Sequence, residues 1–225
     1  MPVNLWRRTY FRYVTETCAA YLEAATSALD LLRDRAVAAA WTAPSALPEF
    51  TVAGLAGHLA HQVLSVPGVL RQPAGEQPPI PLLDHYAAAS WRTAGVDDEV
   101  NVVIRRQGES HAADGLDQLA GRVGAAIVEL SGVLADAPAD RPVFLPWTGW
   151  SLRLDDFLVT RMMEIAVHSD DLAHSVGLAT PPLPEAVLRP VLALLTDLAV
   201  RRHGQPAVLR ALSRAERAPA AINAI

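Results

Sequence analysis

Two side chains of types that commonly bind metal ions lie four residues apart in the segment from Arg161 to Gly177. They are Glu164 and His168. On a helix, this spacing places both side chains on one face, one turn apart. The apolar neighbours Ile165 and Leu172 indicate that the helix packs into a core. Because burial of a carboxylate and an imidazole without partners costs several kcal/mol, the pattern favours a divalent metal ion as their shared partner.

The third ligand that we expect is His58, from an earlier helix. Catalytic zinc sites typically use three His or carboxylate ligands and keep one position open. His58 lies beside Leu59 on the apolar side of its helix, whereas His61, three residues later, is the alternative ligand. His174 is too far round its helix to join the same ion. By itself the Glu-x-x-x-His spacing is common, and it often marks only an ion pair or a hydrogen bond.

Two further polar residues flank the Glu-His pair, and we take both as catalytic candidates. Asp171, one turn beyond His168, would either orient an imidazole by accepting its hydrogen bond or make a hydrogen bond at the helix end. Arg161, one turn before Glu164, would hold a substrate carboxylate or the sugar groups of a thiol. The alternative role for Arg161 is an ion pair with Glu164 or Asp155.

The remaining aromatic, imidazole and thiol side chains carry weaker functional signals. Cys18 lies on an apolar helix face, where a single cysteine is usually part of the core. Large aromatic residues are also core residues more often than not. The tryptophans that we consider as pocket-lining candidates are Trp91, Trp147 and Trp150. The histidines that we interpret as surface or structural residues are His85, His111 and His203.

Helices must position these residues, because apolar residues recur at steps of three and four through much of the chain. Thr51 is the expected N-cap of the helix that carries His58, and Gly177 is the expected C-cap of the helix that carries His168. The long segments with this periodicity are 5–35, 52–65, 116–134, 154–176 and 185–203. They predict an all-α fold, a four-helix bundle with an additional C-terminal helix.

The segments between the long helices give weaker signals. Residues 82–93 and 206–217 predict short helices, and residues 96–109 are equally compatible with a strand, a helix or an irregular link. The prolines and glycine of 137–150 predict a loop. We expect residues 1–177 to form the metal-binding bundle and residues 178–225 to form a helical extension packed on it.

Composition excludes several classes of partner. The chain has 225 residues, a formal net charge of -5 and one cysteine. The negative charge gives no general attraction to nucleic acid or to an anionic membrane. The uncharged stretch 50–70 contains two histidines, a glutamine and a proline, and therefore predicts a buried amphipathic helix rather than a membrane span. A single cysteine and no signal-peptide pattern favour the reducing cytoplasm.

Two motifs, in this order and at this separation, carry a resemblance to a known family. The first is Thr51-Val-Ala-Gly-Leu-Ala-Gly-His58-Leu59, and the second is Arg161-x-x-Glu164-x-x-x-His168-x-x-Asp171-Leu172-Ala173, followed by Gly177. Together they resemble the DinB/YfiT-like superfamily and, within it, the mycothiol-dependent maleylpyruvate isomerase family. The resemblance covers residues 5–177. It implies a four-helix bundle with metal ligands at His58, Glu164 and His168, and mycothiol as cosubstrate.

One departure from the family pattern limits what carries over. The isomerase of this family has a C-terminal α/β domain, whereas the residues after Gly177 predict helix. The resemblance therefore implies thiol chemistry and does not carry over maleylpyruvate as the substrate.

We expect a metal-dependent S-transferase or isomerase. Its metal would be zinc, with nickel or iron as alternatives, because a divalent ion makes a thiolate available at neutral pH for attack on an electrophilic carbon. The expected partners are the thiol and a small-molecule substrate, and the chain would be a monomer or a homodimer. Two alternatives stay open. One is a hydrolase that activates water at the same metal, and the other is a non-catalytic bundle that binds a metal or a small ligand.

Overall fold

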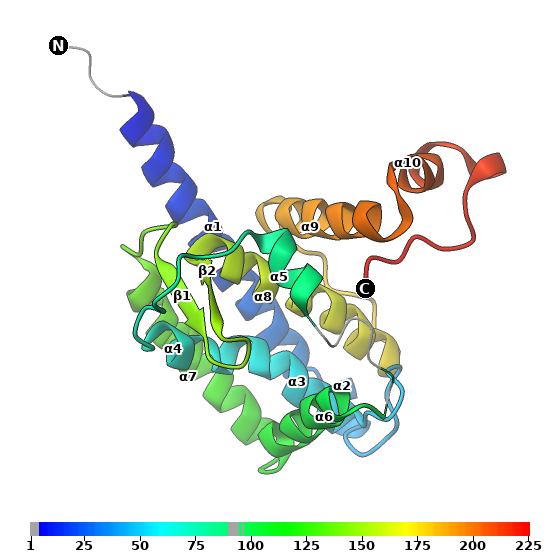
Figure 1. Cartoon of the computed structure of the whole chain (residues 1–225). Helices are drawn as coiled ribbons and strands as arrows, with labels where there is room; N and C mark the ends of the chain where they lie inside the picture. The colour runs from blue at the N-terminus through cyan, green and yellow to red at the C-terminus, as the bar shows by residue number, and fades with distance from the viewer. Residues whose placement is uncertain (1–4, 90–94, 96) are drawn as a thin grey trace.

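Four helices form the core of the molecule. The computed structural model describes residues 5–89, 95 and 97–225, with side chains from residue 16 onward. α1 (Leu5–Leu32) and α3 (Val52–Leu64) each pack against both α7 (Leu116–Leu134) and α8 (Leu154–Ser175) (Figure 1). Their inward faces bury large side chains such as Tyr21 completely. The prediction of an all-α four-helix bundle is confirmed.

Local signals place the helix ends close to the predicted residues. The Thr51 hydroxyl accepts a hydrogen bond from the Gly54 amide at 2.9 Å and so caps α3. Gly177, with φ of 73°, follows the end of α8 in the left-handed conformation that favours glycine. α1 ends at Leu32, three residues before its predicted end. The Asp34 carboxylate there caps a separate short helix, α2 (Arg35–Ala39).

The ambiguous segment 96–109 is mainly helical. It contains most of α6 (Glu99–Ala112), which packs closely along α3. Glycines allow this contact, because a Cβ on Gly57 would lie 2.0 Å from the carbonyl oxygen of Gly108. α4 (Val66–Leu70) follows α3 directly. α5 (Leu82–Ala88) begins where we expected a helix, whereas residues 90–93 of that prediction lie outside the described residues.

The prediction of a loop at 137–150 was wrong in part, because the first strand of a β-hairpin and its turn lie within this segment. β1 (Pro142–Leu145) pairs antiparallel with β2 (Trp150–Arg153), with Pro142 opposite Arg153 and Leu145 opposite Trp150. Gly149 has φ of 82° in the connecting turn. Burial alternates along β1, where Val143 and Leu145 point into the core, whereas β2 buries the consecutive residues Ser151 and Leu152. This burial stabilises the pair despite the flanking prolines.

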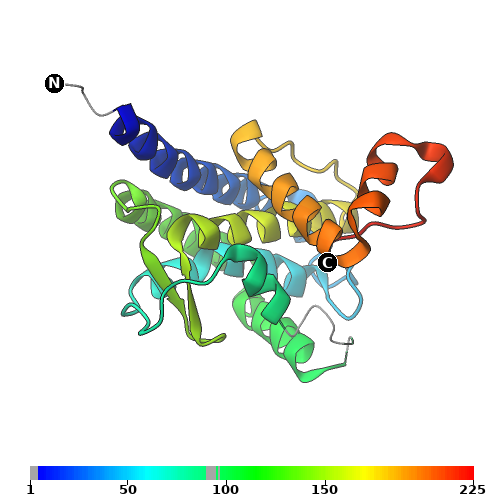
Figure 2. The same cartoon turned by 45° about the horizontal axis from the view of Figure 1, so that its top comes forward.

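The C-terminal residues add helices to one side of the bundle. α9 (Glu185–His203) packs on α1 and α8. It is followed by α10 (Gln205–Ser213) and a 3-10 turn, Ala215–Arg217. Figure 2 shows α9 and α10 on one side of the bundle and α6 on the other. The domain boundary after residue 177 stays a prediction. Within the described ranges, none of the helices combines the length and the apolar character that crossing a membrane requires.

Candidate metal centre

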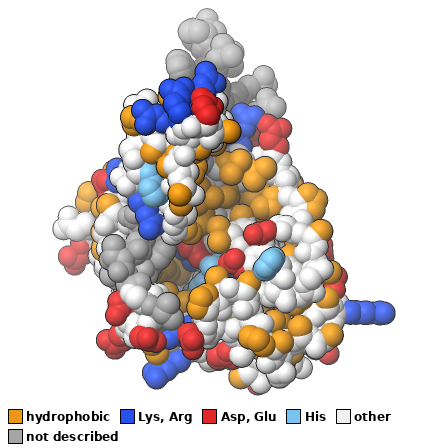
Figure 3. Space-filling model, turned by 90° about the vertical axis from the view of Figure 1, so that its right-hand side faces the viewer, with side chains coloured by type: hydrophobic (Ala, Val, Ile, Leu, Met, Phe, Trp, Pro, Cys, Tyr) orange, Lys and Arg blue, Asp and Glu red, His pale blue; other side chains and the backbone are white. Residues whose placement is uncertain are grey.

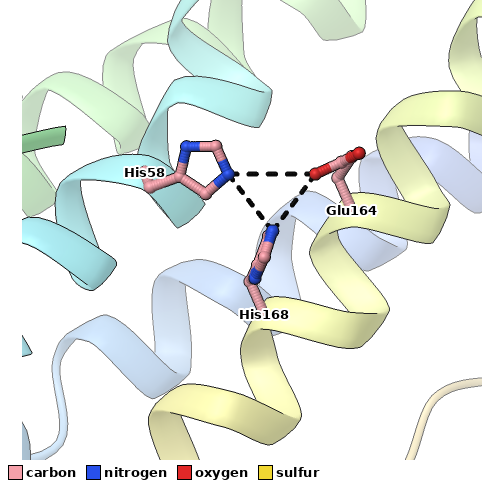
Figure 4. Close-up of side chains that lie close together, drawn as sticks. All are labelled: His58, Glu164 and His168. Atoms are coloured by element: carbon pink, nitrogen blue, oxygen red, sulfur yellow. Dashed lines mark hydrogen bonds and ion pairs between the residues drawn. The ribbon is translucent and has the colours of Figure 1, made fainter. Parts of the chain in front are cut away.

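Three side chains from two facing helices converge on one point of the bundle. His58 comes from α3, and Glu164 and His168 come from successive turns of α8 (Figure 4). The Nε2 atoms of the two histidines are 3.1 Å apart. Glu164 Oε2 lies 3.2 Å from His168 Nε2 and 3.8 Å from His58 Nε2. The structure thus brings together the three residues that the sequence suggests as metal ligands.

The spacing of these atoms fits a single metal ion. A tetrahedral zinc ion with bonds of about 2.0–2.1 Å holds neighbouring ligand atoms about 3.3 Å apart. The three observed separations, 3.1, 3.2 and 3.8 Å, lie around this value. Two imidazoles and one carboxylate are also a donor set that zinc commonly accepts at catalytic sites. The three residues can therefore hold a divalent ion with little rearrangement.

Without a metal ion, a proton balances the charges at this point. Burial alone would raise the pKa of Glu164, but hydrogen bonds with His168 and His58 hold it well below its usual value. Burial would lower the pKa of His168, whereas its hydrogen bonds with Asp171 and Glu164 raise it to about 9. The carboxylate is ionised and the neighbouring imidazole keeps a proton. A divalent cation can replace that proton between the same atoms.

Asp171 determines the orientation of one imidazole. Its Oδ2 lies 3.0 Å from His168 Nδ1. A carboxylate can only accept here, so Nδ1 donates and the His168 Nε2 lone pair is available to a metal ion once its proton leaves. Burial lowers the pKa of His58 despite the nearby Glu164, which favours its neutral, ligating form. The Nδ1 atom of His58 is buried and has no hydrogen-bond partner in the described part of the chain.

Arg161 adopts neither of the ion pairs considered from the sequence. Its Nη1 donates to Gln62 Oε1 at 2.6 Å, and its Nε donates to Thr160 Oγ1 at 3.1 Å. The guanidinium carbon lies 5.6 Å from the centre of the Phe157 ring. Gln62 was not predicted as a functional residue, because a glutamine within an apolar helix face carries no motif of its own. Only the structure shows its contact with Arg161.

The other imidazoles lie away from the metal centre or contact different partners. His61 does not join the three candidate ligands, because its Nδ1 lies 3.1 Å from Nε2 of His111 on α6. His174 is exposed. His85, which we expected to be a surface or structural residue, is buried, and its Nδ1 accepts a hydrogen bond from Trp150 Nε1 at 3.1 Å.

Of the tryptophans considered as pocket-lining residues, Trp150 lines a hollow of about 470 Å³ that contains none of the three candidate ligands. Trp147 is 57% exposed in the hairpin turn, and Trp150 contacts His85. Trp91 lies outside the described residues. Cys18 is buried in the core, as expected from its apolar helix face.

The candidate metal centre is partly open to solvent. The side chains of His58, Glu164 and His168 are 12%, 16% and 15% exposed. Figure 3 shows a face of the molecule with a hollow whose floor is hydrophobic and whose edge carries histidine and acidic side chains. A hollow of about 1140 Å³, lined by residues such as Val159 and Leu194, contains none of the three candidate ligands.

Comparison with known protein families shows which family the chain belongs to. A family model described as the mycothiol maleylpyruvate isomerase N-terminal domain matches residues 22–173. This chain belongs to that family. The matched region contains His58, Glu164 and His168, and it ends before α9. The family connects the chain to mycothiol-related chemistry. Searches of curated proteins and of solved structures found no significant match.

Proposed function

We propose that this chain is a metal-dependent enzyme that uses a low-molecular-weight thiol, mycothiol, for S-transfer to a small electrophile or for its thiol-assisted isomerisation. The observation that supports this most directly is the convergence of His58, Glu164 and His168 within the region that matches a mycothiol-related family. Zinc is the metal that we favour, because two imidazoles and one carboxylate suit it and leave a position open.

The residues of the chain have separate roles in this proposal. When bound, a divalent ion such as zinc lowers the pKa of a thiol, so that thiolate is available near neutral pH. His58, Glu164 and His168 hold the ion. Asp171, through its contact with His168 Nδ1, keeps that ring in the orientation and tautomer that present Nε2 to the ion. The core around α3 and α8 keeps the four side chains in place.

The chemistry then depends on the thiolate and the electrophile. In isomerisation, the sulfur forms a bond to an alkene carbon, and the π electron pair moves into a conjugated carbonyl group. The former double bond rotates, the electron pair returns, and the carbon–sulfur bond breaks to release the thiolate. In S-transfer, the carbon–sulfur bond persists, and either a proton is added to the neighbouring carbon or a leaving group departs with its electron pair.

The first test is the metal content of the purified full-length chain. Mass spectrometry of the wild type should find about one zinc or nickel ion per chain, because three protein ligands bind one ion. His58→Ala and His168→Ala should lose the ion while they keep helical circular dichroism. His174→Ala is the matched control, because it removes an exposed histidine from the same helix. A folded wild type that neither contains a divalent ion nor takes up added zinc would overturn the proposal.

Thiol dependence is the second test. Turnover of a panel of small electrophiles should require mycothiol and should be lost in the two variants that cannot hold the ion. Turnover that consumes water and is unaffected by the thiol would instead identify a hydrolase. Tight binding of metal with no turnover of any electrophile would identify a binding protein.

A further inference from the structure

His85 is a buried imidazole whose tautomer is determined by a tryptophan. Its Nδ1 lies 3.1 Å from the indole Nε1 of Trp150, and the residue is 7% exposed. An indole N–H can only donate, so Nδ1 accepts this hydrogen bond and carries no proton. Protonation of the ring would place a hydrogen on Nδ1 and break the bond. His85 is therefore a neutral imidazole with its hydrogen on Nε2.

The Nε2–H group of His85 is a donor that the described part of the chain leaves without an acceptor. Neither a side chain nor a backbone oxygen there accepts a hydrogen bond from it. The buried polar side-chain atoms that lack a partner in the same ranges are His58 Nδ1 and Ser151 Oγ. Since His85 Nε2 is not one of them, this atom keeps contact with solvent. A ligand that replaces this solvent can accept its hydrogen bond.

Contacts with two other elements hold the ring of His85 in place. The amide of Ile80, just before α5, donates to the Ser151 backbone oxygen of β2 at 2.9 Å. Arg201 of α9 donates to the Leu83 backbone oxygen of α5 at 2.7 Å. Figures 1 and 2 both show α5 beside α8, the helix that carries two of the candidate ligands. The fold therefore fixes the position of His85 relative to that helix.

The charges at the candidate metal centre act on His85. Burial, and then the positive charge of Arg161, lower its pKa to about 4, and the negative charge of Glu164 opposes them. The charges of Glu164 and Arg161 also act on the neighbouring Tyr86. Such interactions weaken with distance and are largely screened beyond about 10 Å in salt solution. His85 is therefore close enough to the centre to contact a small molecule bound there.

Addition of a thiolate to a conjugated carbonyl compound needs a donor of this kind. As the sulfur bonds to the alkene carbon, the π electron pair moves toward the carbonyl oxygen, which becomes an enolate oxygen. A neutral imidazole stabilises this oxygen by donating a hydrogen bond while it keeps its proton. A donor whose orientation is already fixed is more effective than water, because it does not reorganise as the charge develops. The Nε2–H group of His85 has these properties.

We propose that His85 is a catalytic residue whose Nε2–H donates a hydrogen bond to the carbonyl oxygen of the electrophile, and that Trp150 is the positioning residue that fixes its tautomer. This inference rests on the proposed function, because it assigns a group of the electrophile to the same site. The electrophile is then a conjugated carbonyl compound. After the sulfur–carbon bond forms, the electron pair returns from the oxygen and that bond breaks, or a proton from water is added to the α-carbon. His85 keeps its own proton throughout.

Two electrophiles separate this role from a general loss of activity. Cyclohexenone develops negative charge on its carbonyl oxygen when a thiolate adds, whereas benzyl bromide only loses bromide. Turnover of each is measured with the zinc-loaded full chain and mycothiol. His85→Leu removes the donor, whereas His85→Gln keeps an amide that can accept from Trp150 and donate to the substrate. His174→Leu is the matched control, because His174 is exposed on α8.

In His85→Leu, the kcat for cyclohexenone should fall about 100- to 1000-fold, since loss of one oxyanion donor typically has that effect. The KM should change little, because the charge develops only in the transition state. His85→Gln should recover most of the kcat. Turnover of benzyl bromide, and both reactions of His174→Leu, should match the wild type. An equal loss for the two electrophiles, or no loss in His85→Leu with zinc content and helical dichroism unchanged, would overturn the proposal.

Nitrogen NMR of isotopically labelled histidine tests the tautomer and the contact without turnover. The His85 signals, identified by their absence in His85→Gln, should show the hydrogen on Nε2 in the wild type, and a hydrogen on Nδ1 would overturn the proposal. In Trp150→Phe, the ring should take up a proton at a higher pH, because no indole N–H occupies Nδ1. An unchanged titration would overturn the role of Trp150.

The same spectra separate failure of this inference from failure of the proposed function. Cyclohexanone has a carbonyl group but no alkene, and it should shift the His85 Nε2 signal of the zinc-loaded wild type. If it does so but neither electrophile reacts with the thiol, the proposed function fails and the carbonyl contact of His85 stands. If thiol-dependent turnover occurs but the signal does not shift, only the role of His85 fails.

Discussion

The α3 helix contacts its neighbours through two histidine pairs with the same closest nitrogen–nitrogen distance. His58 lies 3.1 Å from His168 of α8, and one turn later His61 lies 3.1 Å from His111 of α6. Both pairs are partly buried at a helix–helix contact. From histidine spacing alone, His58 and His61 are equally eligible as metal ligands.

The charges around the two pairs differ. Glu164 and Asp171 contact His168, and together they raise its pKa to about 9 against the effect of burial. No carboxylate contact with His61 or His111 occurs among the described side chains. Arg122 donates to the backbone oxygen of His111, and burial together with nearby positive charge lowers the pKa of both imidazoles of this pair. The first pair therefore attracts a cation and the second does not. The carboxylates, and not the contact between imidazoles, distinguish a candidate metal site from a structural contact.

The largest effect should come from removing the carboxylate of the first pair. Glu164→Ala should weaken zinc affinity by more than about a hundredfold, because loss of a direct ligand exceeds the 10- to 100-fold loss typical of an outer partner. His111→Ala should leave zinc affinity unchanged. Competition with a chromophoric chelator measures both. Equal loss in the two variants would mean that the second pair also binds the ion.

A smaller loss should follow when only the orientation of His168 is affected. Asp171→Asn replaces the Nδ1 acceptor by an amide and should weaken zinc binding by about 10- to 100-fold while the fold persists. Asp170→Asn is the matched control, because Asp170 is exposed and accepts its hydrogen bond from Thr180. The same chelator competition applies. An unchanged zinc affinity in Asp171→Asn would show that Asp171 does not orient His168 for the ion and makes only a helix-end hydrogen bond.

The sequence predicts what depends on neighbours along the chain. The helix 116–134 agrees with α7 at both ends, and Thr51 caps α3, because periodicity and capping are local properties. Glu164, His168 and Asp171 are spaced by three and four residues, so one helix is enough to align them. The apolar neighbours of His58 favoured it over His61, and only the structure shows that His61 contacts His111 instead.

The features that could not be predicted from the sequence depend on contacts between distant segments. The hairpin lies among prolines that predict a loop, although the alternation of Val143 and Leu145 was a weak strand signal. Trp150 and His85 are 65 residues apart, and Gln62 and Arg161 are 99 residues apart. No periodicity relates such partners. Their pairing follows from the packing of whole helices, which places a polar side chain opposite another one.

The two histidine pairs should respond to pH in opposite directions in chelator-treated protein. The pKa of His168 is raised from 6.5 to about 9, so the folded state holds the extra proton between these values. This stability is fully present below pH 6.5 and is lost as pH rises through 9. We expect a loss of about 1–2 kcal/mol, less than the full shift implies, because the side chain keeps some contact with water. Urea unfolding at pH 6.5 and 9.5 measures this loss. In His168→Gln, the unfolding free energy should depend less on pH over this range.

The second histidine pair should make the folded chain less stable as the pH falls below 6.5. The pKa of His61 is lowered from 6.5 to about 3, so the unfolded chain binds the proton first as pH falls below 6.5. Unfolding free energy should therefore fall by about 1–2 kcal/mol between pH 6.5 and 4.5. His61→Gln should reduce this slope and leave the alkaline one intact. If His61→Gln left the acid dependence of the unfolding free energy unchanged, the folded chain would not keep His61 neutral.

The smallest effect that we expect concerns the helix that both pairs share. The Thr51 hydroxyl accepts from the Gly54 amide at 2.9 Å and donates to Glu109 Oε1 of α6 at 2.8 Å. Thr51→Ala should lower the unfolding free energy by about 1 kcal/mol, as loss of an N-cap usually does. Thr51→Ser keeps the hydroxyl and should restore most of it, as urea unfolding can show. Zinc affinity should stay close to that of the wild type, because His58 lies two turns inside α3. If Thr51→Ala instead weakened zinc binding as much as Asp171→Asn, the position of His58 would depend on the cap and on α6. The two histidine pairs would then be coupled through α3 rather than independent.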